Sequence, residues 1–225
     1  MYKKIIKIFK LLVLNILELK IFRIIPDTIY LKLKYRIRMG EKLYLNRAQP
    51  FNEKLQWLKL HDKNPSYTNL VDKYKVRKHV AKTIGKEYLT PLIWVWDKFD
   101  DIDFENLPNQ FVLKSTHDSG EVVICTDKNK LDIEAARKKI NKSLKRNYFY
   151  NSREWPYKNV KPRIICEELI KTKDGGLPSD YKFHCFNGEP DSVMVCIERD
   201  SGNPRFFFFD KEWNLLRYNI TRCAS

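Results

Sequence analysis

The chain has 225 residues, of which 43% are hydrophobic and 32% charged, a composition typical of a globular protein with a core and not of a disordered chain. Its seven glycines form neither a G-x-G-x-x-G nor a G-x-x-x-x-G-K-[ST] motif, which excludes a Rossmann dinucleotide site, a P-loop and a protein-kinase glycine loop. The net charge of +15 is concentrated in residues 1–50, where twelve Lys or Arg face three Asp or Glu. Such a segment favours an anionic partner, either lipid or nucleic acid.

The cysteines and histidines indicate neither a disulfide framework nor a zinc site. The five cysteines include no C-x-x-C pair, and four of them lie in apolar strand-like runs, which predicts small buried side chains in a reducing compartment. The four histidines lack metal-ligand spacing such as H-E-x-x-H. The cysteines are Cys125, Cys166, Cys185, Cys196 and Cys223.

Residues 3–25 form the most apolar segment and are predicted to be helical, although the apolar surface is interrupted by Lys3, Lys7, Lys10, Glu18 and Lys20. Crossing a bilayer is not expected, because each lysine held near the bilayer centre costs roughly 2.5–3.5 kcal/mol. No small-residue cleavage site follows that would mark a signal peptide. Two alternatives stay open: the helix of residues 1–25 lies on an anionic membrane surface, or it packs on the protein. Residues 28–47 continue as a basic helical connector.

Two helices and a strand are predicted before the next motif. The second helix carries Lys73 in its N-terminal turn and Arg77 in its apolar period. The expected elements are a helix over 52–60 with Asn52 as N-cap, a helix over 69–84, a strand over 92–96 and an acidic connector over 97–103.

Residues 111–120, FVLKSTHDSG, predict a hairpin with a single lysine, Lys114, at the mouth of its turn. Small hydroxyl residues and a glycine let backbone N–H groups approach an anion, and a neighbouring lysine supplies a compact charge that suits phosphate. The turn from Ser115 to Gly120 therefore predicts a phosphate contact, although an ordinary hairpin has the same pattern.

The remainder of the chain predicts a helix followed by a strand-rich region, hence an α+β fold. Alternation in DYKFHCF places Asp180, Lys182 and His184 on one face of their strand. Glu167 and Glu168 end the preceding apolar strand. Beside the row of Asp180 and Lys182 they would form a cleft with both negative and positive side chains, which would suit a nucleotide. The elements are a helix after an Asp132 cap, strands over 163–170, 180–186, 192–198 and 205–209, and a tight turn at Asn187-Gly188.

Several motifs in register resemble the TupA-like ATP-grasp family, which is associated with teichuronopeptide, capsular and related surface-polysaccharide synthesis and is often labelled glycosyltransferase. The matching text covers roughly residues 50–215. It includes FNEKLQWLKLHD, DKYKVRKHV, IDFENLPNQFVLKSTHDSG, EWPYKNVKPRIICEEL and DYKFHCFNGEP. The resemblance implies an ATP-grasp-like α+β fold with a basic helical arm (1–50), a helical region (51–108) and a nucleotide-binding region of antiparallel sheets with packed helices (109–225).

The resemblance also implies ATP and Mg²⁺ as ligands and the ligation of a carboxylate to an amine through an acylphosphate. Lys73 and Lys114 would reach the phosphates, under a flexible flap formed by the turn from Ser115 to Gly120. Ser119 and Gly120 belong to that flap. Glu167, Glu168 and Ile170 would form the hinge that contacts adenine, and Asp180 would bind the ribose hydroxyls. Lys182 would face the same cleft, and Lys114 and Lys182 are the catalytic candidates. The acceptor, a saccharide or an amino acid, stays open.

The metal ligands of the wider fold lie on a late acidic strand, and none of Asp191, Glu198, Asp200 and Asp210 matches that motif. We therefore assign no metal ligand, expect the chain to lack the last part of the fold, and expect little or no ligase turnover.

Two other functions compete with an ATP-dependent ligase. A glycosyltransferase would use the D-x-D triplet of Asp101 and Asp103, and a degenerate chain would catalyse nothing. Nucleic-acid binding is not expected, because the aromatic residues lie in apolar strands and are not interleaved with exposed basic residues. The predicted location is the cytoplasm, peripheral on the inner face of the plasma membrane.

Overall fold

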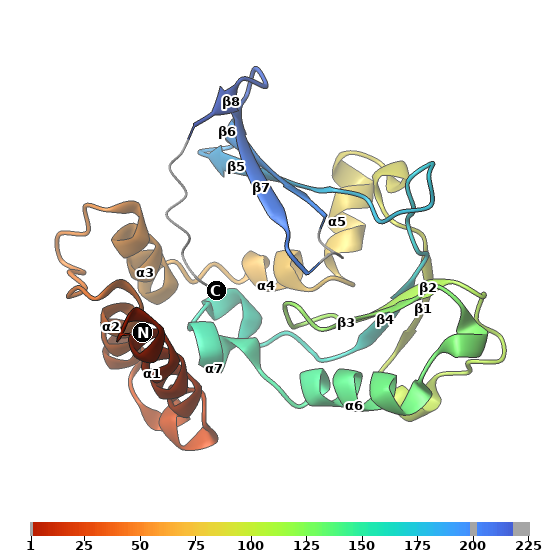
Figure 1. Ribbon diagram of the computed structural model, residues 1–225, viewed down its shortest axis with the longest axis horizontal. Coiled ribbons are helices and arrows are strands. Elements are labelled where there is room, and N and C mark those ends of the chain that lie inside the picture. The colour runs from red at the N-terminus through yellow and green to blue at the C-terminus, as the bar shows by residue number, and fades with distance from the viewer. Residues whose placement is uncertain (1, 199–201, 218–225) are drawn as a thin grey trace. The chain divides into compact units, whose positions relative to one another are not determined.

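The computed structural model describes residues 2–198 and 202–217, with side chains from residue 8 onward, so Asp200 and Cys223 lie outside the described residues. The chain divides into two compact units, residues 1–169 and residues 170–225 (Figure 1). The predicted domain boundaries after residues 50 and 108 both fall inside the first unit, and they stay predictions.

Helices form the N-terminal part of the first unit: α1 (Tyr2–Leu17), the 3₁₀ helix η1 (Lys20–Ile24), α2 (Asp27–Met39) and α3 (Phe51–His61). The continuous helix predicted over 3–25 is therefore wrong, because regular α-helix ends at Leu17. The Asn52 cap is also wrong, since α3 begins at Phe51 after Pro50, whose extended backbone (φ −65°, ψ 148°) precedes the helix without a side-chain cap. Among the described helices, none combines the length and apolar character needed to cross a membrane.

The helix predicted over 69–84 is two helices, α4 (Ser66–Val71) and α5 (Val76–Thr83). Asp72 causes the break, because its backbone turns extended (φ −71°, ψ 109°) and its buried carboxylate accepts hydrogen bonds from the backbone N–H groups of Tyr74 (2.9 Å) and Lys75 (3.2 Å). A short acidic side chain that bonds to nearby backbone competes with helix continuation. The break leaves Lys73 in a connection between helices.

An antiparallel sheet with strand order β1-β4-β2-β3 forms the centre of the first unit. Its strands are β1 (Leu92–Trp96), β2 (Phe111–Ser115), β3 (Val122–Cys125) and β4 (Ile164–Glu167), which confirms the predicted strand over 92–96 and the hairpin. Helix α6 (Ile133–Leu144) packs against β2 and β3, and Ile140 joins Phe111, Leu113, Ile164 and Cys166 in the core (Figure 1). Because side chains alternate along a strand, Lys114 and Glu167 project from the opposite face.

Short elements complete the first unit. The Asp132 carboxylate accepts a hydrogen bond from the backbone N–H of Ala135 (2.8 Å), which confirms it as the cap of α6. The remaining elements are α7 (Tyr148–Ser152) and the 3₁₀ helices η2 (Lys86–Tyr88), η3 (Phe99–Asp101), η4 (Lys128–Lys130) and η5 (Trp155–Tyr157).

The second unit is an antiparallel meander of β5 (Asp180–Phe186), β6 (Glu189–Ile197), β7 (Arg205–Asp210) and β8 (Leu215–Leu216). Asn187 and Gly188 have φ values of 52° and 87°, which confirms the predicted tight turn. Strand β6 begins earlier than predicted, and β8 was not predicted. Two antiparallel sheets with helices give the α+β class that the sequence predicted.

Most described cysteines are buried, as the sequence predicted: Cys125, Cys166 and Cys196 lie inside. Burial raises the pKa of the Cys166 thiol to about 12, so it stays protonated and inert at neutral pH. The prediction is wrong for Cys185, which is exposed like nearly all the residues of β5.

Candidate functional site

Lys73 is held against the β2–β3 turn by backbone and side-chain hydrogen bonds. Its backbone N–H donates to the carbonyl of Thr116 (3.1 Å), and its Nζ donates to the carbonyls of Ser115 (2.9 Å) and Asp118. Burial lowers the pKa of Lys73, and the positive charge of Lys114 lowers it further, against the opposite effect of Asp118. The broken helix thus brings a second lysine to the mouth of the hairpin.

Lys114 forms an ion pair on the sheet face opposite α6. Its Nζ lies 2.6 Å from Oε2 of the buried Glu167, and Oε1 of the same carboxylate accepts from Nη1 of Arg77 at 2.9 Å. Arg77 also donates to the carbonyl of Thr90 (2.7 Å). Two cations share one carboxylate, so the group carries a net positive charge. Lys114 keeps about a third of its side chain exposed and has N–H donors left for another acceptor.

The first half of the turn is buried and fixed. Thr116 exchanges hydrogen bonds with the backbone of Arg163 and donates its hydroxyl to the carbonyl of Lys161 (3.1 Å). The Ser115 hydroxyl lies 2.6 Å from the Ser143 hydroxyl on α6. The Ser115 side chain, predicted to contact ATP, is therefore engaged inside the protein.

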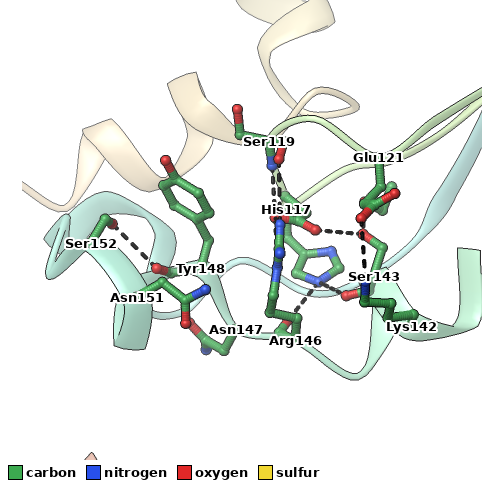
Figure 2. A network of polar contacts seen from close by, with 12 residues as sticks. His117, Ser119, Glu121, Lys142, Ser143, Arg146, Asn147, Tyr148, Asn151 and Ser152 are labelled. Atoms are coloured by element: carbon green, nitrogen blue, oxygen red, sulfur yellow. Dashed lines mark hydrogen bonds and ion pairs between the residues drawn. The ribbon is translucent and has the colours of Figure 1, made fainter. Parts of the chain in front are cut away.

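Asp118 is the centre of a buried polar network, whose members His117, Ser119, Ser143 and Arg146 are labelled in Figure 2. Its carboxylate accepts hydrogen bonds from Nη2 of Arg146 (2.6 Å), the Ser143 hydroxyl (2.7 Å) and the Ser119 backbone (2.8 Å), while Nε2 of His117 contacts the carbonyls of Ser143 (3.1 Å) and Arg146 (2.9 Å). Burial alone would raise the pKa of Asp118, but the hydrogen bonds from Arg146 and Ser143 outweigh it and hold the pKa below its usual value. Burial lowers the pKa of His117, so this ring is neutral at pH 7.

Only the end of the turn is open. Ser119 and Gly120 are exposed, and Gly120 has φ of +104°, a conformation that favours glycine. One end of the hairpin therefore carries Lys73, the net positive group that includes Lys114, and the exposed Ser119-Gly120 pair. This arrangement is suited to an anion.

The sequence model of the TupA-like ATPgrasp family matches residues 53–224, which is most of the chain. The chain belongs to the TupA-like ATP-grasp family. Neither the comparison with curated proteins nor the comparison with solved structures gives a significant match. ATP-grasp proteins use ATP with Mg²⁺, so the family assignment implies ATP as a substrate.

The other residues to which the ATP-grasp resemblance gives roles belong partly to the first unit and partly to the second. The backbone N–H of Glu168 donates to the carbonyl of Pro91 (3.1 Å), which ties the end of β4 to the start of β1. Ile170 is exposed and begins the second unit. Asp180 and Lys182 lie on β5, paired in register with Cys196 and Met194 of β6. Their roles stay predictions.

The acidic residues weighed for a metal mostly serve local structure. Asp103 accepts hydrogen bonds from the side chain (2.6 Å) and backbone (3.4 Å) of Asn106, which lower its pKa, and Asp210 accepts from the backbones of Glu212 (3.0 Å) and Asn214 (2.8 Å). Glu198 pairs with Arg205. Within residues 2–198 and 202–217, no three His, Cys, Asp or Glu side chains gather into a group able to hold a metal ion.

The sequence did not predict a role in the site for three residues: Arg77, Asp118 and Arg146. The sequence does hold a signal for Arg77. An arginine among the apolar positions of a helix needs an acidic partner when it is buried, and Glu167 at the end of an apolar strand could supply one. Asp118 stood inside the turn motif, but nothing in the sequence marks Arg146 as its partner among the basic residues that follow α6.

Proposed function

We propose that the chain binds the phosphates of ATP between Lys73 and Lys114, beside Ser119 and Gly120. The observation that carries the proposal is the position of both lysines at the mouth of the hairpin: Lys114 directly precedes Ser115 on β2, and Nζ of Lys73 donates to the carbonyl of Ser115 (2.9 Å). Repulsion by the charge of Lys114 also lowers the pKa of Lys73. An anion between them would relieve this repulsion. Phosphate oxygens are suited to the remaining N–H donors of both lysines.

The chemistry proposed for this site is the ATP-dependent activation of a carboxylate in surface-polysaccharide synthesis. The γ-phosphoryl group moves to a carboxylate, ADP leaves, and an amine then displaces phosphate to form an amide. Negative charge develops on the transferred oxygens during the first step, so positioned lysines stabilise it. Glu167 holds Lys114 in place through a 2.6 Å ion pair, which acts as a positioning contact.

The binding step is tested by thermal unfolding with and without Mg-ATP. A ligand that binds only the folded state stabilises it by about 2.7 kcal/mol at a hundred times its Kd. We therefore expect the unfolding midpoint to rise by several degrees with Mg-ATP, and by less with Mg²⁺ and adenosine, which lacks phosphates. An unchanged midpoint at millimolar Mg-ATP would count against the site.

We also propose that α1 and η1 bind an anionic membrane surface. One side of α1 is apolar and exposed, and Phe9, Leu12 and Ile16 are each at least half exposed, whereas Leu17 on the opposite side is 5% exposed. Ile21 and Ile24 of η1 extend the apolar surface at 70% and 86% exposed. Residues 1–50 carry nine excess positive charges, which complement anionic headgroups.

Flotation with vesicles tests the membrane proposal. We expect binding to vesicles with anionic lipid at low salt and much less binding to neutral vesicles. Ile16→Asp should weaken partitioning about tenfold more than Asn15→Asp, because both add a charge but only the first removes a side chain worth about 1.5–3 kcal/mol of apolar burial. Equal loss in the two variants, or no binding to anionic vesicles, would rule the proposal out.

A further inference from the structure

A polar cavity of about 430 Å³ lies within the first unit, between the N-terminal helices and α7. Its volume falls in the range of small-molecule sites. The lining is rich in charged, amide and tyrosine side chains, with Leu31 and Met39 as its aliphatic members. The polar lining residues are Glu18, Lys34, Tyr35, Arg38, Asn52, Gln56, Lys59, Arg146, Tyr148, Asn151, Ser152 and Glu154.

Four cations and two carboxylates line this cavity, so its charge is positive. Lys34 is only 10% exposed at its side chain, and its Nζ lies 3.5 Å from Glu18 and donates to the carbonyl of Asn151. Lys59 is 23% exposed and lies 3.7 Å from Glu154, with its Nζ donating to the carbonyl of Ser152 (3.1 Å). Both lysines thus cap the last carbonyls of α7 and keep further N–H donors.

Arg38 is the least satisfied cation of the cavity. Its guanidinium, on an exposed side chain, forms no hydrogen bond or ion pair with another residue that the structure describes, and its positive charge disfavours the charged forms of Lys34 and Lys59. Burial lowers the pKa of Lys34 and of Lys59, and the charge of Arg38 lowers both further. Lys34, Lys59 and Arg38 thus place three positive charges on the cavity lining, and Arg38, which is exposed, can donate to an anion that enters the cavity.

The cavity also reaches the turn that carries the candidate phosphate site. Arg146 lines the cavity and binds the Asp118 carboxylate through Nη2 and Nε (2.6 and 3.2 Å), while the Asp118 carbonyl accepts from Lys73. Figure 2 shows Tyr148, Asn151 and Ser152, three further lining residues, on the segment that follows Arg146. Asp118 therefore contacts both Arg146 of the cavity wall and Lys73 of the candidate phosphate site.

We infer that this cavity binds the second substrate of the enzyme, a small hydroxylated molecule that carries a carboxylate or phosphate group. The anionic group lies among Lys34, Arg38 and Lys59. The amides of Asn52, Gln56 and Asn151 offer donors and acceptors for hydroxyl groups. The inference rests on the proposed ATP-dependent function, because the cavity supplies the site for the molecule that ATP would activate or ligate.

Calorimetric titration with three probes on one ring tests the inference in the absence of ATP. Glucuronate carries a carboxylate, glucose 6-phosphate carries a phosphate, and glucose is neutral. We expect at least one of the two anions to bind and glucose not to bind. The stronger anion identifies which group the site prefers. Binding without ATP separates a failure of this cavity from a failure of the ATP site, which the same preparation reports in its response to Mg-ATP.

Two variants of one helix make the test specific. Arg38→Gln should weaken binding of the preferred anion about tenfold, the loss of one charge-assisted hydrogen bond. Arg36→Gln is its matched control, since Arg36 is exposed on the same helix but outside the cavity lining, and it should change the affinity less than twofold. Equal weakening by both variants, equal binding of glucose, or no binding of either anion would overturn the inference.

Discussion

Lys114→Ala is expected to weaken Mg-ATP binding by about tenfold to a hundredfold, since a hydrogen bond to a charged group contributes about 1.5–3 kcal/mol and each 1.4 kcal/mol is a factor of ten. Lys114 is partly exposed at the mouth of the hairpin and holds N–H donors beyond its ion pair with Glu167. The measurement is calorimetric titration of the wild type and the variant with Mg-ATP, well below their unfolding temperatures.

Two controls separate a lost phosphate contact from a disturbed fold. Lys138→Ala removes an exposed lysine of α6 and should leave ATP affinity unchanged. Arg77→Ala removes the other partner of Glu167 (2.9 Å) but keeps Lys114, so it should lower stability while affecting ATP affinity much less. If Lys114→Ala binds ATP as tightly as the wild type, or if Arg77→Ala loses as much affinity as Lys114→Ala, Lys114 does not contact the phosphates.

Asp118→Ala is expected to destabilise the protein by about 3 kcal/mol and to lower the unfolding midpoint by roughly 10 °C, because it breaks a buried charge pair and leaves its partners unpaired. The Asp118 side chain is fully buried, and the variant would remove acceptors from Arg146, from Ser143 and from the backbone of Ser119. Thermal unfolding at pH 7 measures the loss.

The pH dependence of this loss has a defined sign. The pKa of Asp118 is lowered in the folded state, so its contribution is present above the unfolded-state pKa of about 3.9 and disappears as the pH falls through the folded-state pKa. The difference between wild type and Asp118→Ala should therefore be constant near neutral pH and shrink below about pH 4. Asp101→Ala, which removes an exposed carboxylate, should leave the midpoint unchanged. A loss of under 1 kcal/mol for Asp118→Ala would mean that the network does not stabilise the fold.

Local patterns predicted the regular elements well. The hairpin around Lys114 and the turn at Asn187-Gly188 follow from strand alternation and from residues that tolerate positive φ, which are properties of neighbouring residues. The Asp132 cap belongs to the same class of local signal.

Two of the predictions failed where contacts with distant residues add to local ones. Helical periodicity continues through Asp72, yet the helix breaks there because the carboxylate bonds to nearby backbone N–H groups and Lys73 donates its backbone N–H to Thr116. The polar turn from Ser115 to Asp118 looks like an exposed loop in sequence, whereas it is buried, with Ser115 bonded to Ser143 and Asp118 bonded to Ser143 and Arg146. Sequence spacing carries no information on either partnership.

We propose that Lys73 and Lys114 together bind the phosphates of ATP. The most direct measurement is a crystal structure of the chain with a non-hydrolysable ATP analogue. We predict phosphate oxygens within hydrogen-bond distance of both Nζ atoms, beside Ser119 and Gly120. A triphosphate bound elsewhere, with Lys73 bonded only to the carbonyls of Ser115 and Asp118 and Lys114 bonded only to Glu167, would contradict the claim.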